Sequence, residues 1–572
     1  MERLWHYARL HKRQTTWGIL MLLCTNLCAQ LIPQLTRWAI DAIESGDSYI
    51  VLREIAGLLA LTALGSCCFR ALSRVHIFFA AREVEMRLRS DYFKHIATMD
   101  PQFFQEHSIG DLMSRATNDL GQLRLLLGPG ILNIVNTTLA YAVAIPLMWV
   151  ISSKLTLAIL TTYLPALLLM RYLAKLLYLR NREQQAKMGD LSAFVQESLA
   201  GAHVIRAFAL DESKAERFKT FNQASYEAGV HLAWLRSGMF RIVMSLSALT
   251  TLIAVYVGAQ EVVNGQLRLG DVVAIIEYMA LLTWPTFALG WVLSMWQRGH
   301  AAMNRLNAIF DRQPEISSVG DFLEQVEPSI SIRELTVELG GVEVLNGLSV
   351  ELREGQTLGI VGTIGSGKST FLKALMRFVP IKENMIFYGG HDVVRCETRS
   401  LRAQFGYVPQ ENILFSKSLL ENVAFGRPSV PQDKIEEALK MAAFDYDDGT
   451  LPEGLLTPVG ERGISLSGGQ KQRLSMARAM LLDPPVLILD DSLSAVDSET
   501  EERILRNLRD IRKGKTTIIA THRISAVSGA DEILVLNEGK VIERGTHVEL
   551  LRIDGLYASM LRKQELTASL AS

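Results

Sequence analysis

The residues with the clearest chemistry form a glycine-rich segment, GTIGSGKS, at residues 362–369. It follows the apolar run TLGIV and precedes the helical pattern TFLKALMRF, which is the context of a phosphate-binding loop. Glycines let backbone N–H groups wrap a phosphate, and the N-terminus of the next helix favours its negative charge. Lys368 would reach the β- and γ-phosphates, and the Ser369 hydroxyl would bind magnesium. The predicted nucleotide contacts are Gly362, Thr363, Ile364, Gly365, Ser366, Gly367, Lys368, Ser369 and Thr370.

Two neighbouring carboxylates follow a second apolar run, VLILDD, at residues 486–491. Asp490 ends this predicted strand, where its carboxylate can hold magnesium directly or through water. Asp491 comes directly after it. An ordinary strand end is the alternative interpretation, and the phosphate loop in the same chain argues against it.

A third segment, LSGGQKQR at residues 466–473, precedes the helical pattern LSMARAMLL. Ser467, Gly468 and Gly469 would cap this helix and present N–H donors to an anion. Taken alone, the segment is equally compatible with a helix cap that has no ligand.

The elements that must position these residues begin near residue 328, where short β-branched runs alternate with helical patterns. This alternation predicts an α/β domain with a largely parallel sheet. The first half of the chain is different, because it holds apolar runs long enough to cross a bilayer, which takes about 20 residues. These runs predict six spans, near residues 17–40, 55–80, 129–151, 155–176, 238–262 and 272–296.

Lysine and arginine residues indicate how the predicted spans are oriented. They are frequent in the long connections 82–128 and 177–237, whereas the opposite short loops offer mainly Arg53, Lys154 and Arg268. By the positive-inside rule we expect both termini in the cytoplasm. The long connections also carry apolar residues at helical spacing, which favours helices that meet another domain over a solvated linker.

Composition excludes some classes of function. The chain has 572 residues and a formal net charge of -1, with 59 Lys and Arg against 60 Asp and Glu, so nothing indicates a basic surface for nucleic acid. Four of its five cysteines lie in apolar helical segments, which gives no disulfide framework.

The motifs GTIGSGKS, YVPQ, LSGGQ, VLILDD, SAVD and ATHR occur in this order after the six predicted spans. In this combination the sequence resembles the ABC transporter superfamily, specifically exporters with one membrane domain fused to one nucleotide-binding domain. The resemblance covers nearly the whole chain and includes segments similar to bacterial multidrug and lipid exporters. It implies an all-α six-helix transmembrane domain and an α/β P-loop ATPase domain of the ABC type. The expected divisions are residues 1–305 for six spans and cytoplasmic coupling helices, 306–327 for a linker and 328–572 for the nucleotide-binding domain.

The resemblance also implies ATP and Mg²⁺ as cofactors, with two nucleotide-binding domains that face head to tail. Each ATP would lie between the phosphate loop of one chain and the LSGGQ of the other, so this half transporter must pair with a second one. Gln410 would sense the γ-phosphate and bind magnesium with Ser369 and Asp490, and His522 would contact the γ-phosphate. The partner's ATP would meet Ser467, Gly468, Gly469 and Gln470.

Two positions depart from the family pattern. Asp491 stands where a glutamate usually polarises the attacking water, and a carboxylate displaced by about one ångström can lower the rate on the order of a hundredfold. Leu339 stands where an aromatic residue usually stacks on adenine, so a π-stacking contribution is lost. We therefore predict a site that binds ATP but hydrolyses it poorly, in a heterodimer with a glutamate-bearing partner. A slow homodimer is the alternative.

The leading hypothesis from the sequence is a subunit of an ATP-driven exporter of amphipathic or hydrophobic compounds, in the bacterial cytoplasmic membrane. Aromatic and sulfur side chains of the last predicted span, such as Trp284, Trp291 and Met295, suit either a polyspecific cavity or contact with lipid and neighbouring helices. The segments near 110–117 and 201–207 are the predicted coupling elements. An ATP-gated channel or sensor is the competing hypothesis, and the sequence does not identify the transported compound.

Overall fold

The computed structural model describes residues 1–324, 326–427, 429–446, 451–460 and 466–571, and the chain divides into two compact units. The first unit contains Met1–Ala97 and Ile109–Arg312. The second unit contains Thr98–Ser108 and Gln313–Ser572. A short segment from the first half of the sequence, with helix α4 (Pro101–Glu106), therefore belongs to the second unit.

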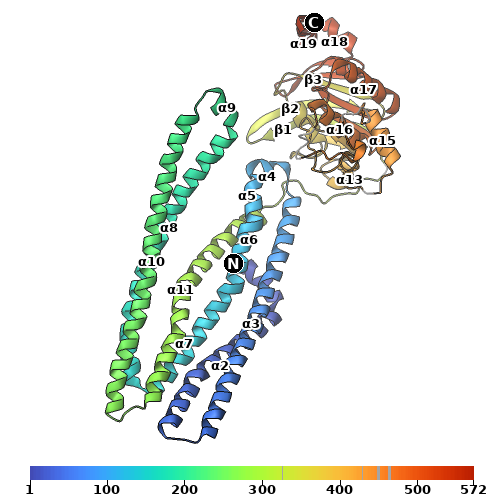
Figure 1. Cartoon of the computed structure of the whole chain (residues 1–572). Coiled ribbons are helices and arrows are strands. Elements are labelled where there is room, and N and C mark those ends of the chain that lie inside the picture. Colours follow the sequence, from blue (N-terminus) through green and yellow to red (C-terminus); the bar gives the residue numbers. More distant parts are fainter. Residues whose placement is uncertain (325, 428, 447–450, 461–465, 572) are drawn as a thin grey trace. The chain divides into compact units, whose positions relative to one another are not determined.

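The first unit is helical throughout its described elements (Figure 1). Helices α8 and α10 lie side by side, and α2 packs against α3, α7 and α11. The elements are α1 (Glu2–Leu10), α2 (Lys12–Glu44), α3 (Tyr49–Ala97), α5 (Ile109–Ser114), η1 (Arg115–Asp119), α6 (Leu120–Leu125), η2 (Leu126–Gly130), α7 (Ile131–Ile151), α8 (Ser153–Ala200), α9 (Ala202–Ala207), α10 (Asp211–Val263) and α11 (Leu269–Phe310).

Four helical stretches of the described chain are long and apolar enough to cross a membrane: Lys12–Glu44, Tyr49–Ala97, Ile109–Ile151 and Leu269–Phe310. A shorter apolar stretch covers Ala248–Val263. These stretches coincide with four of the six predicted spans, and the count of six spans stays a prediction. Helices α3, α8 and α10 have 49, 48 and 53 residues. At about 1.5 Å per residue they are roughly 70–80 Å long, well beyond the bilayer core of about 30 Å, as expected for spans that continue outside the membrane.

The second unit combines strands and helices in the predicted α/β pattern. Its elements after α4 are β1 (Ile330–Leu339), β2 (Val342–Leu352), β3 (Thr357–Gly362), α12 (Lys368–Leu375), β4 (Ile386–Tyr388), β5 (His391–Asp392), α13 (Thr398–Arg402), β6 (Phe405–Val408), α14 (Leu419–Ala424), α15 (Gln432–Met441), η3 (Gly454–Leu456), α16 (Gly468–Met480), β7 (Val486–Asp490), α17 (Ser498–Ile511), β8 (Thr516–Thr521), η5 (Ser525–Val527), β9 (Glu532–Asn537), β10 (Lys540–Gly545), α18 (His547–Ile553) and α19 (Leu556–Ala571).

These strands form two sheets. The larger one has the order β10-β9-β3-β8-β7-β6, and its strands from β9 to β6 pair in parallel. The smaller one is antiparallel, with the order β2-β1-β4-β5. Because strands β3, β8, β7 and β6 run in the same direction, the residues that follow them all lie along one edge of the sheet, where ligands bind in open α/β sheets.

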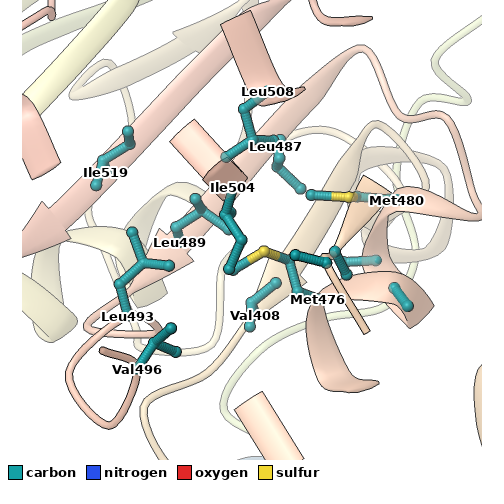
Figure 2. Close-up of a cluster of buried hydrophobic side chains, with 14 of the residues drawn as sticks. Val408, Met476, Met480, Leu487, Leu489, Leu493, Val496, Ile504, Leu508 and Ile519 are labelled. Carbon is teal, nitrogen blue, oxygen red and sulfur yellow. The ribbon is translucent and has the colours of Figure 1, made fainter. Parts of the chain in front are cut away.

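Alternate residues of the central strands face two different cores. On β7, Leu487 and Leu489 join a cluster with helices α15, α16 and α17, which Figure 2 shows around Met476, Met480 and Ile504. The intervening residues, Val486 and Ile488, join a second cluster with α12 and the smaller sheet. Each fully buried side chain of this type contributes about 1.5–3 kcal/mol, so the strand is fixed on both faces. Asp490, which ends the strand, and Asp491, which follows it, are therefore held in place by the core behind them.

Candidate functional site

The phosphate loop joins β3 to α12 and depends on glycine at several positions. Gly365 and Gly367 have φ angles of 82° and 100°, which residues other than glycine rarely adopt. A Cβ on Gly362 would lie 2.2 Å from the carbonyl oxygen of Leu536 on β9. Ile364 is 99% exposed at the tip of the loop. The loop thus has the bare, outward backbone that phosphate binding needs.

Lys368, at the start of α12, folds back over the loop. Its Nζ donates hydrogen bonds to the carbonyl oxygens of Gly362 and Thr363, both at 2.9 Å. Burial lowers the pKa of Lys368, and the neighbouring carboxylates of Asp491 and Asp490 partly oppose this. An anion in the loop would give the Lys368 ammonium a partner of opposite charge in place of two neutral carbonyl oxygens.

The Asp490 carboxylate is buried at the end of β7 and has two hydroxyl donors. Oδ1 accepts from Ser369 Oγ at 2.9 Å, and Oδ2 accepts from the Tyr407 hydroxyl at 3.1 Å. Burial raises the pKa of Asp490, and these two hydrogen bonds oppose the rise. Magnesium prefers hard oxygen ligands and needs only one or two from the protein besides the nucleotide phosphates. The Ser369 hydroxyl and the Asp490 carboxylate fit this requirement.

Asp491 lies one residue beyond the strand in a left-handed conformation, with a φ angle of 47°. Its N–H donates to the Ala520 carbonyl at 2.8 Å, which fixes the turn against β8. Its Oδ1 is 2.8 Å from His522 Nδ1 and 3.4 Å from Thr521 Oγ1. Asp491, the predicted water-activating residue, and His522, the predicted γ-phosphate contact, are therefore hydrogen-bonded to each other.

The other residues predicted for this site occupy different positions around it. Gln410 is exposed two residues beyond the end of β6, on the same edge of the sheet as Asp490. Leu339 ends β1 in the smaller sheet and pairs with Val342 across the hairpin. Strand β2 of this hairpin touches the phosphate loop, because a Cβ on Gly367 would lie 2.6 Å from Leu345 Cδ2.

The LSGGQ residues form the N-terminus of α16. Ser467 is its N-cap: Ser467 Oγ accepts from the N–H of Gln470 at 3.2 Å, and Gln470 Oε1 accepts from the N–H of Ser467 at 2.8 Å. This is a capping box, which satisfies two backbone donors within the segment. Gly468 and Gly469 form the first turn, where N–H groups of a helix favour an anion.

Several side chains that support these residues were not predicted from the sequence. Tyr407 binds Asp490, and Gln472 connects α16 to the loop after Asp491 through Ser494 Oγ at 3.1 Å and the Ala495 N–H at 3.0 Å. Gln564 of α19 donates to the His522 carbonyl at 2.5 Å and accepts from the Ile524 N–H at 3.0 Å. The alternation of β6 brings Tyr407 to the same face as other site residues, but no local pattern signals the contact from Gln564.

The parallel sheet, the phosphate loop and the carboxylates at its edge define a P-loop ATPase unit, joined in one chain to helices that can span a membrane. The sequence matches two families, described as "ABC transporter transmembrane region" over residues 16–286 and "ABC transporter" over residues 345–494. The chain belongs to the ABC transporter superfamily, among exporters with fused membrane and ATP-binding domains, and is a multi-pass membrane protein.

Curated relatives and a solved structure match it along almost its full length. It is 36% identical to the probable multidrug resistance ABC transporter ATP-binding/permease protein YheI of Bacillus subtilis, over 99% of this chain and 98% of that one. It is 33% identical to the multidrug resistance-like ATP-binding protein MdlA of Escherichia coli, over 99% of this chain and 96% of that one. The structure of a bacterial Atm1-family ABC exporter with ATP bound is 27% identical, with a TM-score of 0.80, over 97% of this chain and 99% of that one.

Proposed function

We propose that this protein is one subunit of an ATP-driven exporter that moves amphipathic or hydrophobic compounds out of the cytoplasm or the inner leaflet. The observation that carries the proposal is the set of Lys368, Ser369, Asp490 and His522 at one sheet edge, in a chain that also has membrane-spanning helices. The names of the two relatives, which refer to multidrug resistance, support an amphipathic cargo. The proposed location is the bacterial cytoplasmic membrane, with both termini in the cytoplasm.

In this proposal the chain's residues bind ATP through the phosphate loop. Lys368 would exchange its carbonyl partners for the β- and γ-phosphates, and Ser369, Asp490 and Gln410 would hold Mg²⁺, which when bound would neutralise phosphate charge. His522 contacts the γ-phosphate. Ser467 and the N–H groups of Gly468 and Gly469 act on the ATP of a second ABC half transporter.

We further propose that the ATP site built on this chain's phosphate loop hydrolyses slowly. Asp491 is one methylene shorter than glutamate, and its Oδ1 already accepts from His522 and lies near Thr521. A carboxylate held back in this way is badly placed for a water molecule in line with the γ-phosphate. The efficient site would then use this chain's Ser467 and the catalytic glutamate of a different partner chain.

Uptake into inside-out vesicles tests whether the complex is a pump. A fluorescent amphipathic cation, Mg²⁺ and either ATP or a non-hydrolysable analogue are added, and accumulation against a gradient is expected with ATP only. Passive flux with either nucleotide would contradict the pump and indicate an ATP-gated channel.

The mass of the complex, purified through a tag on this chain, tests the heterodimer. A second polypeptide with glutamate at the position equivalent to Asp491 is expected. A complex of two identical chains would contradict the asymmetric arrangement and leave a slow homodimer.

A further inference from the structure

A small cavity lies within the first unit, where the N-terminal helix α1 meets α2. Its volume is about 200 Å³. Its lining comes from α1, the start of α2, α3 and the junction of η2 with α7. The lining residues are Trp5, Ala8, Arg9, His11, Lys12, Thr15, Thr16, Ile77, Ala80, Ala81, Val84, Leu127 and Ile131.

The cavity at α1 is small, with a volume of about 200 Å³. This is less than the roughly 300–1,000 Å³ of sites that enclose a drug-sized molecule. A ligand of the cavity at α1 therefore extends beyond it. Because the cavity lies on helices that span a membrane, the bilayer is the natural place for the rest of that ligand.

One wall of this cavity is apolar and is made by a single face of α3. Ile77, Ala80, Ala81 and Val84 follow the spacing i, i+3, i+4, i+7, which places them in one stripe on a helix. Leu127 and Ile131 complete the wall. The four residues of the stripe are only 1–5% exposed, so this wall forms the closed, apolar inner end of the cavity.

The opposite rim is basic and contains Arg9, His11 and Lys12. No carboxylate is among the lining residues in the part of the chain that the structure describes. Arg9 and Lys12 have no ion-pair partner among the described residues, although many other arginines of this unit pair with Asp or Glu. The Nε2 atom of His11 is buried and lacks a hydrogen-bond partner. The rim thus offers positive charge and an unused polar nitrogen.

The position of the rim along the chain places it at a membrane surface. His11 separates α1 from α2, Lys12 begins α2, and the apolar run follows from Trp17. Trp5 also lines the cavity, and tryptophan is enriched at the level of lipid headgroups. Basic pockets between membrane helices at this level suit anionic lipid headgroups.

We propose that this cavity binds one anionic phospholipid. The phosphate lies against Arg9, His11 and Lys12, the glycerol end of the lipid meets the apolar wall, and the acyl chains extend out of the cavity into the bilayer. A free phosphate does not account for the apolar wall, and a zwitterionic lipid does not account for the unpaired basic rim. The site is separate from the nucleotide contacts and is independent of the proposed transport activity.

Native mass spectrometry of the full-length protein with its partner subunit tests the proposal. The complex is reconstituted in vesicles of equal parts phosphatidylglycerol and phosphatidylcholine, extracted, and delipidated stepwise until few lipids remain. The wild-type complex is expected to retain phosphatidylglycerol in preference to phosphatidylcholine. Each Lys or Arg near an anionic surface strengthens binding about fivefold. The double variant Arg9→Gln with Lys12→Gln should therefore lower this preference on the order of twentyfold.

Two further variants separate the cavity from general surface charge. Arg13 is exposed beside the rim but does not line the cavity, so Arg13→Gln should leave the preference unchanged. Thr16 is exposed and lines the cavity, so Thr16→Trp should block retention without any change of charge.

Three results would overturn the proposal: no preference for phosphatidylglycerol in the wild type, equal losses for Arg13→Gln and the double variant, or full retention in Thr16→Trp. Size-exclusion profiles confirm that each variant assembles. All of these substitutions replace exposed residues, so the fold does not depend on them.

Discussion

The edge of the large sheet and the start of α16 are stabilised in different ways. At the sheet edge, side chains from α12, β6 and the end of β8 bond to Asp490 and Asp491. At the start of α16, Ser467 and Gln470 bond to each other. The sheet edge is a tertiary structure, in which residues distant in sequence converge. The α16 end is a local cap, built within four residues. The residues proposed to bind magnesium and phosphate are thus assembled within the chain, whereas the start of α16 is exposed, which agrees with the proposal that a second chain completes that site.

The sheet edge and the start of α16 are nevertheless connected within the chain. Gln472 of α16 is buried and bonds to Ser494 and Ala495, in the loop that begins at Asp491. The Asp491 carbonyl in turn accepts from Ser494 Oγ at 3.0 Å. Three hydrogen bonds therefore link the residues after the sheet edge to α16. Substitutions at each end can test whether their roles are as unequal as proposed.

The largest effect is expected at the local cap. Ser467→Arg places a bulky cation where we propose that N–H donors face the partner's ATP, and loss of one such preorganised donor costs about 10²–10³ in rate. Steady-state ATPase activity of the purified complex should fall by at least that factor. Thr546→Arg is the matched control, because Thr546 caps α18 in the same way with Glu549. If the control loses as much activity, the effect is loss of a helix cap and not of an ATP contact.

The next effect is expected at the phosphate loop. Lys368→Ala removes a charge-assisted contact to phosphate, worth about 1.5–3 kcal/mol, so binding of nucleotide at this chain's site should weaken about 10- to 150-fold. Photolabelling of this chain with an ATP analogue measures the change. Lys373→Ala, on the exposed side of the same helix, should label like the wild type. Wild-type labelling of Lys368→Ala would exclude Lys368 from the site.

A smaller effect concerns stability and pH. Burial raises the pKa of Asp490 above its ordinary value of 3.8, so the folded state holds this proton more tightly than the unfolded state. The resulting stabilisation is present below pH 3.8 and is lost as the pH rises through the raised value. At pH 7 the folded protein therefore carries the cost of a buried charge.

Asp490→Asn should remove this cost. Without nucleotide or Mg²⁺, its Tm at pH 7 should rise by about 2–4 °C, which corresponds to about 1 kcal/mol. The gain should disappear near pH 4. Asp497 provides the control, because a hydrogen bond from the Thr500 N–H lowers its pKa, so Asp497→Asn should not raise the Tm. An equal gain for both variants would show that the change reflects overall charge.

The smallest effect is expected at Asp491. We propose that the Asp491 carboxylate is badly placed for water activation, so Asp491→Ala should change the ATPase rate of the complex by less than about twofold, and Asp491→Glu should only add turnover at the second site. Both rates are measured beside that of Ser467→Arg. Should Asp491→Ala prove as damaging as Ser467→Arg, Asp491 is a working base and the proposed difference between the two ATP sites is wrong.

The sequence was sufficient to predict the phosphate loop, the strand that ends at Asp490 and the cap at Ser467, because each is encoded in consecutive residues. The parallel sheet also followed from the alternation of short strands and helices. Contacts between distant elements could not be predicted in this way. Tyr407 reaches Asp490 only because β6 pairs with β7, and Gln564 reaches His522 only because α19 returns to the end of β8.

In the helical half of the chain, too, contacts between distant segments could not be predicted from the sequence. The apolar runs predicted long helices, and α3, α8 and α10 confirm that these continue beyond the length of a span. The predicted coupling segment at 110–117 stays a prediction; it belongs to the first unit, whereas its neighbour Thr98–Ser108 groups with the second unit. Composition does not distinguish these neighbours, because both are short and amphipathic, and their grouping depends on contacts with residues more than two hundred positions away.

Asp100 illustrates one of those contacts, since its Oδ2 accepts from the N–H groups of Glu315 and Ile316 at 2.6 and 3.2 Å. A recombinant fragment cut at Gln313, the natural choice for producing a soluble ATPase, would lack this carboxylate and the whole of α4. Its exposed surface would include a bare docking face, prone to self-association at the concentrations used for crystallisation. A fragment with residues 98–108 grafted onto its N-terminus through a flexible linker would restore the missing piece, and it is the better starting point for biochemistry on the ATPase unit alone.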